Sequence, residues 1–126
     1  MSGVKLNQLK KKSPKKGEGV GDFFNKDISF GSSKMGDKEK ETMYSSLAIL
    51  LDAGITLKDA LDIIENQLSK KKTKELVVNI RKELIHGVSF SEALAKKKDF
   101  SVYEIYSVKI GEETGMLAFV LTELSS

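Results

Sequence analysis

From residue 37 onward, apolar residues recur every three or four positions in short stretches that end at glycine or at lysine runs. This spacing gathers the apolar side chains on one face of a helix. We therefore expect an all-α fold, a compact bundle of about six short helices with antiparallel or corner packing, because the connections are short. The expected helices cover residues 38–53, 57–69, 73–86, 90–95, 102–110 and 116–124.

Glycine and hydroxyl residues mark several of the expected helix ends. Gly54 and Gly87 follow the first and third helices, where glycine adopts the left-handed conformation at little cost. A hydroxyl residue three positions before an acid predicts a capping box at three helix starts: Thr56 with Asp59, Ser89 with Glu92, and Ser101 with Glu104. Residues 51–61 also align with residues 84–94, 33 positions on, which predicts two similar αα-corners in one bundle.

Charged and flexible residues predict the remaining ends. Asp37 is the expected N-cap of the first helix. The lysine runs Lys70–Lys72 and Lys96–Lys98 are expected to end the second and fourth helices, because the helix dipole favours cations at the C-terminal end. Residues 111–115, Gly-Glu-Glu-Thr-Gly, are expected to form a turn before the last helix.

The first 36 residues differ from the rest and are called the N-terminal arm. They hold six of the ten glycines and the only proline, and residues 1–40 contain ten lysines against five acids in a chain of net charge +3. This composition favours a flexible, solvated arm. A basic arm that binds nucleic acid or anionic lipid is the alternative. Phe23, Phe24 and Phe30 are candidates for docking on a groove of the bundle or of a partner.

Little in the composition supports catalysis. The chain has no cysteine and one histidine, His86, so disulfides, thiol nucleophiles and His-rich metal sites lack material. The longest apolar run has five residues, 47–51, whereas a membrane span needs about 20. Glu112 and Glu113 are the one candidate pair for a small hydrolase, but adjacent side chains point apart. We expect no catalytic, cofactor-binding or metal-binding residues, hence no enzyme. For Glu112, a cap of the last helix, a subunit interface and a share in a divalent cation site stay open.

Three blocks of residues resemble a known family. Residues 47–61 read LAILLDAGITLKDAL and resemble the opening motif, roughly LAxLLxAGIPLxxAL, of the F-type platform proteins of bacterial type II secretion and type IV pilus systems. Residues 87–94, GVSFSEAL, are similar to the middle block GxSLSxAL, and Phe100 with residues 111–117, GEETGML, to the closing FP…GExSGxL block. Thr56 and Ser101 replace two family prolines near helix starts, and we interpret them as structural equivalents.

The resemblance implies a function that the residues alone do not give. Residues 37–126 would form a cytoplasmic domain of a polytopic protein, on the cytoplasmic face of the bacterial inner membrane, and the chain would be a fragment. The implied role is a protein–protein interaction module that couples the secretion or pilus ATPase to pseudopilus or pilus assembly. Expected partners are the ATPase, other platform components and a second copy, with membrane contact through segments outside this chain and no nucleic acid. The implied signature residues are Gly54, Thr56, Gly87, Ser89, Phe100, Gly111, Glu112 and Gly115.

The alternative function is a soluble helical adaptor whose basic arm binds nucleic acid. It predicts binding that weakens strongly with salt and disappears when residues 1–20 are removed.

Overall fold

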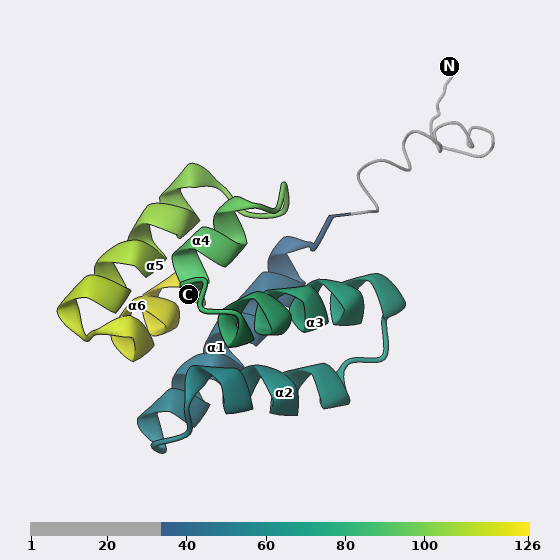
Figure 1. The fold of residues 1–126 in the computed structure, drawn as a ribbon, viewed down its shortest axis with the longest axis horizontal. Coiled ribbons are helices and arrows are strands. Elements are labelled where there is room, and N and C mark those ends of the chain that lie inside the picture. The colour runs from purple at the N-terminus through teal and green to yellow at the C-terminus, as the bar shows by residue number, and fades with distance from the viewer. Residues whose placement is uncertain (1–33) are drawn as a thin grey trace. The chain divides into compact units, whose positions relative to one another are not determined.

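Six α-helices make up the fold (Figure 1), in a computed structural model that describes residues 34–126. They are α1 (Asp37–Asp52), α2 (Leu57–Gln67), α3 (Lys71–Ile85), α4 (Phe90–Ala95), α5 (Val102–Thr114) and α6 (Leu117–Leu124). The expectation of an all-α fold with six short helices is therefore confirmed for this part of the chain. The predictions for Phe23, Phe24 and Phe30, and for most of the N-terminal arm, fall outside the described residues.

The helices contact one another in a closed ring. Each helix packs on the next one along the chain, and α6 also packs on α1. In Figure 1 the α5–α6 pair lies on one side of α1 and the α2–α3 pair on the other. All six helices supply fully buried side chains to one core: Tyr44, Leu47, Leu61, Val77, Ile80, Phe90, Leu94, Val108 and Leu121. Met35 joins this core before α1 begins, and its N–H donates to Asp99 Oδ2 at 2.8 Å.

The two predicted αα-corners have the same backbone geometry. Gly54 and Gly87 both take positive φ angles, 91° and 93°. At each glycine the preceding helix ends with the same pair of bonds: the glycine N–H and the next N–H reach back to two carbonyls of the last turn, as Gly54 to Leu51 and Ile55 to Leu50. A hydroxyl residue, Thr56 or Ser89, then begins the next helix. The internal similarity at 33 positions therefore marks one repeated corner.

The lysine run Lys70–Lys72 lies at a helix start and not at a helix end, so that prediction is wrong. Helix α2 stops at Gln67, and α3 begins at Lys71 with Lys70 as its N-cap. Cations are unfavourable at this end of the dipole, and an acid from another helix offsets them. Glu39 of α1 lies 3.4 Å from Lys70 Nζ and accepts the Thr73 hydroxyl at 2.9 Å. The compensating charge is 31 positions away in sequence, so the local pattern does not reveal it.

Two further boundaries differ from the expectation. Gly36, not Asp37, caps α1, because the Gly36 N–H donates to Glu39 Oε1 at 2.9 Å and Asp37 is already helical. Residues 111–114 continue α5, and the helix ends at Gly115, whose φ is 73°. The predicted turn over residues 111–115 is therefore limited to its last glycine. The run Lys96–Lys98 does follow the end of α4, as expected.

Candidate interaction surface

Glu112 joins the last signature block to the middle one. Its carboxylate, on α5, accepts the Phe90 N–H at 2.7 Å, the Ser91 N–H at 3.3 Å and the Ser91 hydroxyl at 2.6 Å. These donors belong to the first turn of α4, where backbone N–H groups lack partners within the helix. A carboxylate also interacts favourably with the positive end of the helix dipole. Glu112 therefore caps α4, a role that was not among the three alternatives left open for it.

The same helix start has a second, local cap. Ser89 Oγ accepts the Glu92 N–H at 3.2 Å, and Glu92 Oε1 accepts the Ser89 N–H at 3.2 Å. Together with Glu112, this capping box provides acceptors for all four N–H groups from residue 89 to residue 92. Helix α4 has only six residues, and a helix that short is not stable by itself. Its position depends on these caps and on the buried side chains of Phe90 and Leu94.

Gly111 lets α5 and α6 approach closely. A Cβ atom at this buried position would lie 3.0 Å from the Leu117 Cα and 3.1 Å from the Val120 Cγ2. Such distances are shorter than ordinary van der Waals contact, so a larger side chain would push the two helices apart. Gly111 therefore serves helix packing. Because Glu112 is the next residue, this packing also fixes where its carboxylate meets α4.

Phe100 and the start of α5 are tied to α1. Phe100 is buried, and Lys40 Nζ lies 5.3 Å from the centre of its ring. Lys40 also pairs with Glu104 at 3.1 Å, and Glu104 accepts the Tyr44 hydroxyl and, at 2.9 Å, the Ser101 N–H. Burial alone would raise the pKa of Glu104, but hydrogen bonds from Tyr44, Ser101 and Lys40 outweigh it and lower that pKa below its ordinary value.

Gly54, Thr56, Gly87 and Ser89 lie at the two corners, and Gly115 ends α5. Ser89 and Glu112 also line an open hollow that has Glu92, Lys109 and Glu113 among its walls. Thr56 Oγ1 accepts the Asp59 N–H at 3.2 Å, as expected. The return bond from Asp59 to the Thr56 N–H, expected for a full capping box, is absent among the described contacts. Aspartate is one methylene shorter than the glutamate that makes this bond at Ser89 and Ser101. The signature residues therefore hold helices in place, and none of them meets a candidate catalytic partner in the described part of the chain.

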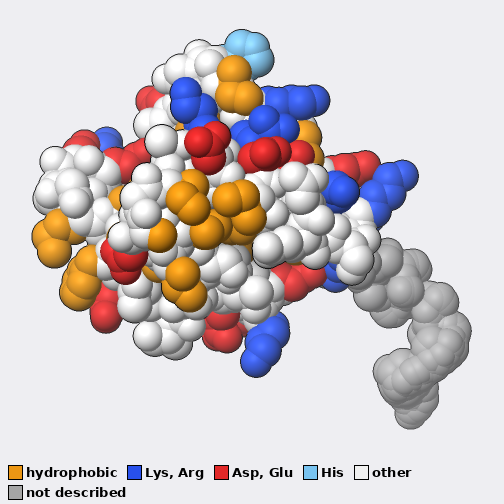
Figure 2. Space-filling view, turned by 90° about the horizontal axis from the view of Figure 1, so that it is seen from below, with side chains coloured by type: hydrophobic (Ala, Val, Ile, Leu, Met, Phe, Trp, Pro, Cys, Tyr) orange, Lys and Arg blue, Asp and Glu red, His pale blue; other side chains and the backbone are white. Residues whose placement is uncertain are grey.

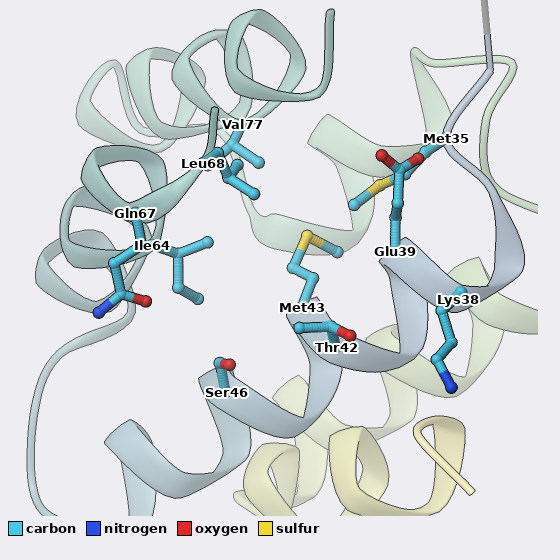
Figure 3. A pocket seen from close by; sticks show the side chains of 10 residues that line it. All are labelled: Met35, Lys38, Glu39, Thr42, Met43, Ser46, Ile64, Gln67, Leu68 and Val77. Carbon is cyan, nitrogen blue, oxygen red and sulfur yellow. The ribbon is translucent and has the colours of Figure 1, made fainter. Parts of the chain in front are cut away.

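An apolar cleft opens between α1 and the α2–α3 pair. It has a volume of about 290 Å³, with Met35, Met43, Ile64, Leu68 and Val77 among its walls. Figure 3 shows Met43 of α1 pointing across the gap toward Leu68 and Val77, while Lys38 points away. Thr42, Ser46 and Gln67 supply polar groups, but this lining has no nucleophile paired with a base. The cleft can accept an apolar side chain and offers no arrangement for catalysis.

Helix α5 is apolar on its solvent side as well as on its core side. Val102, Tyr103, Tyr106 and Ile110 are between 57% and 72% exposed, whereas Val108, on the opposite side, is fully buried. Phe119 and Met116, at α6, are also largely exposed. We call these six exposed residues of α5 and α6 the α5–α6 face. A surface helix of a monomeric protein normally has a polar outer side, so this face is the main candidate for an interaction surface.

Figure 2 shows that hydrophobic and charged side chains are unevenly distributed over the surface. On the side of the molecule seen in that view, hydrophobic side chains gather in the middle and at the left edge. Most of the basic side chains lie further to the right. The left of the same view corresponds to the side on which α5 and α6 lie in Figure 1. This surface was not predicted from the sequence, because the expectation for each helix was a single apolar face. The signal was present: Tyr103, Tyr106 and Ile110 recur at helical spacing opposite Val108.

Two further properties of the described residues bear on function. Within residues 34–126, no group of three or more His, Asp or Glu side chains is placed to hold a metal ion. None of the six helices combines the length and the apolar character that crossing a membrane requires. The geometry therefore offers an exposed apolar face and an apolar cleft as its candidate sites.

Comparison with known proteins identifies the family. Residues 43–126 match the family model for the type II secretion system (T2SS), protein F. The type IV pilus assembly protein PilC of Thermus thermophilus is 38% identical over 91 residues, which cover 72% of this chain and 22% of that protein. A protein transport protein HofC homolog of Escherichia coli is 33% identical over 91 residues, 71% of this chain and 22% of that protein.

The type II secretion system protein F of Aeromonas hydrophila is 32% identical over 80 residues, 63% of this chain and 21% of that protein. The chain thus spans about a fifth of the length of these relatives. The family match covers all three sequence blocks and every described helix except the first six residues of α1. The chain therefore belongs to the type II secretion system protein F family.

Proposed function

We propose that residues 37–126 form a protein–protein interaction domain of an inner-membrane platform protein, on the cytoplasmic side, in a type II secretion or type IV pilus system. Its role is to connect the assembly ATPase to pseudopilus or pilus assembly. Family membership supports the choice of machinery. The observation that carries the interaction role is the α5–α6 face, whose aromatic and aliphatic side chains are exposed in the described unit.

The contrast with the core supports this proposal. Tyr106 and Ile110 belong to a helix whose opposite side is fully buried at Val108, so they are not needed to hold α5 in the bundle. Aromatic residues are enriched at the centres of protein interfaces because they bury a large area at a small cost in conformational entropy. No group of side chains within residues 34–126 is arranged for a reaction, and we propose that the domain has neither a catalytic site nor a cofactor.

The experiment uses the full-length parent protein in its native cells. A photo-crosslinking amino acid is placed at Tyr106, on the α5–α6 face, and in a second strain at Ile49 of α1, which is 66% exposed and lies outside that face. Membranes are fractionated, and crosslinked products are probed with an antibody against the assembly ATPase. We expect the parent protein in the inner-membrane fraction, with an ATPase crosslink from position 106 and none from position 49.

A functional readout accompanies the crosslink. Changing Tyr106 and Ile110 together to aspartate should abolish pili or secretion, while the matched Ile49→Asp change should preserve them. Unaltered pili and secretion in the Tyr106 and Ile110 variant would overturn the interaction role of the face. A parent protein found outside the inner membrane would overturn the platform assignment. Crosslinks to another component of the machinery, with none to the ATPase, would reject the ATPase as the direct partner.

A further inference from the structure

The α5–α6 face includes a groove that suits one kind of partner element. Between α5 and α6 lies a hollow of about 170 Å³, with Tyr103, Ile110 and Phe119 in its walls. Tyr103 and Ile110 are seven positions apart on one helix side, which corresponds to about 10 Å along the axis. An amphipathic partner helix presents its own apolar residues at the same repeat of three, four and seven positions. The spacing of Tyr103 and Ile110 therefore matches the apolar repeat of a partner helix.

The borders of this face are acidic. Segment 102–126 has one basic residue, Lys109, and four acids. Two of the acids are engaged, since Glu104 pairs with Lys40 and Glu112 caps α4. Glu113, which lines the same hollow as Tyr106, and Glu123, in the wall of the groove, are exposed and form no ion pair with residues in the described part of the chain. They outnumber Lys109, the exposed cation that lines the same hollow as Glu113 and Tyr106, so the charge beside the apolar groove favours a basic partner.

The charges decide between the possible occupants. An anionic lipid surface would meet Glu113 and Glu123 with like charge, which opposes docking of this face on the membrane. A two-fold contact between identical faces would bring the same carboxylates of two copies together, because such an interface is self-complementary. A partner whose apolar stripe is flanked by lysine or arginine meets neither penalty and gains steering by opposite charge.

We propose that the α5–α6 face binds an amphipathic helix of a partner protein, whose apolar residues enter the Tyr103–Phe119 groove and whose flanking lysine or arginine residues face Glu113 and Glu123. The inference rests on the proposed function only in taking the face as a protein-binding surface. It adds the element, its chemistry and the residues that select it. Glu113 and Glu123 act as specificity-determining residues beside an apolar anchor site.

The test uses two fluorescent peptides of about 18 residues, which is about five helical turns. Both carry leucine at the same helical repeat, and lysine and arginine flank the stripe in one, while glutamate flanks it in the other. Binding to the 126-residue chain is measured by fluorescence anisotropy at low and high salt. We expect the basic peptide to bind at least about tenfold more tightly than the acidic one, and to lose most of that advantage in high salt.

Chain variants locate the binding. Ile110→Ser removes an exposed apolar anchor and should weaken binding of the basic peptide about tenfold. Ile49→Ser changes a similarly exposed isoleucine of α1 and should leave the affinity unchanged. Changing Glu113 and Glu123 together to glutamine should reduce the difference between the two peptides while the acidic peptide binds at least as well as before. Circular dichroism confirms that each variant retains its helices.

Several outcomes overturn the inference. These are equal binding of the two peptides, no binding of the basic peptide, or equal losses in the Ile110 and Ile49 variants. Dimers in sedimentation that disappear with Ile110→Ser would assign the face to a second copy, and binding of the chain to anionic vesicles that disappears with the same variant would assign it to lipid. The peptide experiment contains no ATPase, so it tests the helix-binding face independently of that partner. Binding as expected, together with a missing ATPase crosslink in cells, would support this inference and reject the ATPase as the direct partner.

Discussion

The two αα-corners share one backbone geometry but differ in how the following helix begins. Thr56 of the first corner binds one N–H of α2, and its acid Asp59 makes no return bond. Ser89 of the second corner forms a full capping box, and Glu112 from α5 adds three hydrogen bonds. Where the first corner has Lys58, an exposed residue, the second has the buried Ser91.

The lengths of the two helices explain this difference. Helix α2 has eleven residues, enough for several internal hydrogen bonds, whereas α4 has six. The shorter helix depends on acceptors from elsewhere, because most of its backbone N–H groups lie in its first turn. Similar local sequence patterns therefore precede two helices that differ in how much they depend on contacts from other helices. The cap of the second corner includes Glu112 from another helix, whereas the cap of the first corner comes from its own segment.

The largest expected effect comes from removing that carboxylate. Glu112→Ala should lower the free energy of unfolding by about 3 kcal/mol, because hydrogen bonds to a charged group are lost and the buried Ser91 hydroxyl loses its acceptor. The matched change in the first corner, Asp59→Ala, should cost about 0.5 kcal/mol, since this acid contributes mainly through the helix dipole. Urea unfolding followed by circular dichroism measures both. Equal losses of stability in the two variants would show that the second corner does not depend more strongly on its acid than the first.

Proline substitutions at two capped starts sharpen the comparison next. Thr56 has φ of −67°, close to the value that proline imposes, and its N–H has no acceptor among the described residues, so Thr56→Pro should change stability by less than about 1 kcal/mol. The Ser101 N–H donates to Glu104 at 2.9 Å, so Ser101→Pro should cost about 2 kcal/mol. From the sequence, Thr56 and Ser101 are both interpreted as structural equivalents of proline. Equal urea midpoints for the two variants would support that interpretation over this prediction.

Alanine at the two corner glycines should show where the corners are the same. Gly54 and Gly87 have almost equal positive φ, and a Cβ at either position would meet open space. The cost is therefore the left-handed backbone alone, and each of Gly54→Ala and Gly87→Ala should lower stability by about 1 kcal/mol. Thermal and urea unfolding of the two variants should agree closely. A much larger loss at Gly87 would mean that the glycine geometry, and not only Glu112, distinguishes the second corner.

The smallest expected effect is the loss of stability at low pH caused by protonation of Glu104, at the start of α5. The pKa of Glu104 is lowered from 4.5 in the folded protein, so its stabilising effect is present above that value and is lost as the pH falls through the folded pKa. Glu104→Gln should cost about 1 kcal/mol at neutral pH. The difference between wild type and variant should then narrow below about pH 4.5. Urea midpoints measured from pH 7 to pH 3 test this. A difference that does not change with pH would exclude the ionised carboxylate as the cause.

Local signals were sufficient for much of this fold. Apolar spacing placed all six helices, and the hydroxyl residues Thr56, Ser89 and Ser101 marked three starts correctly, because the groups that satisfy them lie within three positions. Two of the errors occurred where the partner is distant, whereas the misplaced cap of α1 involves Glu39, only three positions from Gly36. Lysines at the start of α3 depend on Glu39 of α1, and Gly111 belongs to a helix because α6 packs against it.

The candidate site shows the same limit. The sequence singled out Glu112 but not its hydrogen-bond donors, since Phe90 and Ser91 are more than 20 positions away. Tyr106 and Ile110 follow a helical repeat, but periodicity does not state which of two apolar sides of α5 meets the core. Only the packing of α4 and α6 against the Val108 side leaves the other side exposed. Residue type and spacing thus predict elements, and contacts between elements decide the surface.

The closed ring of helices has a mechanical consequence. Asp37, at the start of α1, and Leu124, at the end of α6, line the same small surface hollow, and the two helices pack together. Tension applied between these two points would load the α1–α6 pair directly at that shared end. The contacts between α1 and α6 would then separate one after another from that end, before the force reached α2, α3 or α4. The bundle would yield to stretching at one seam while the two corners stayed folded.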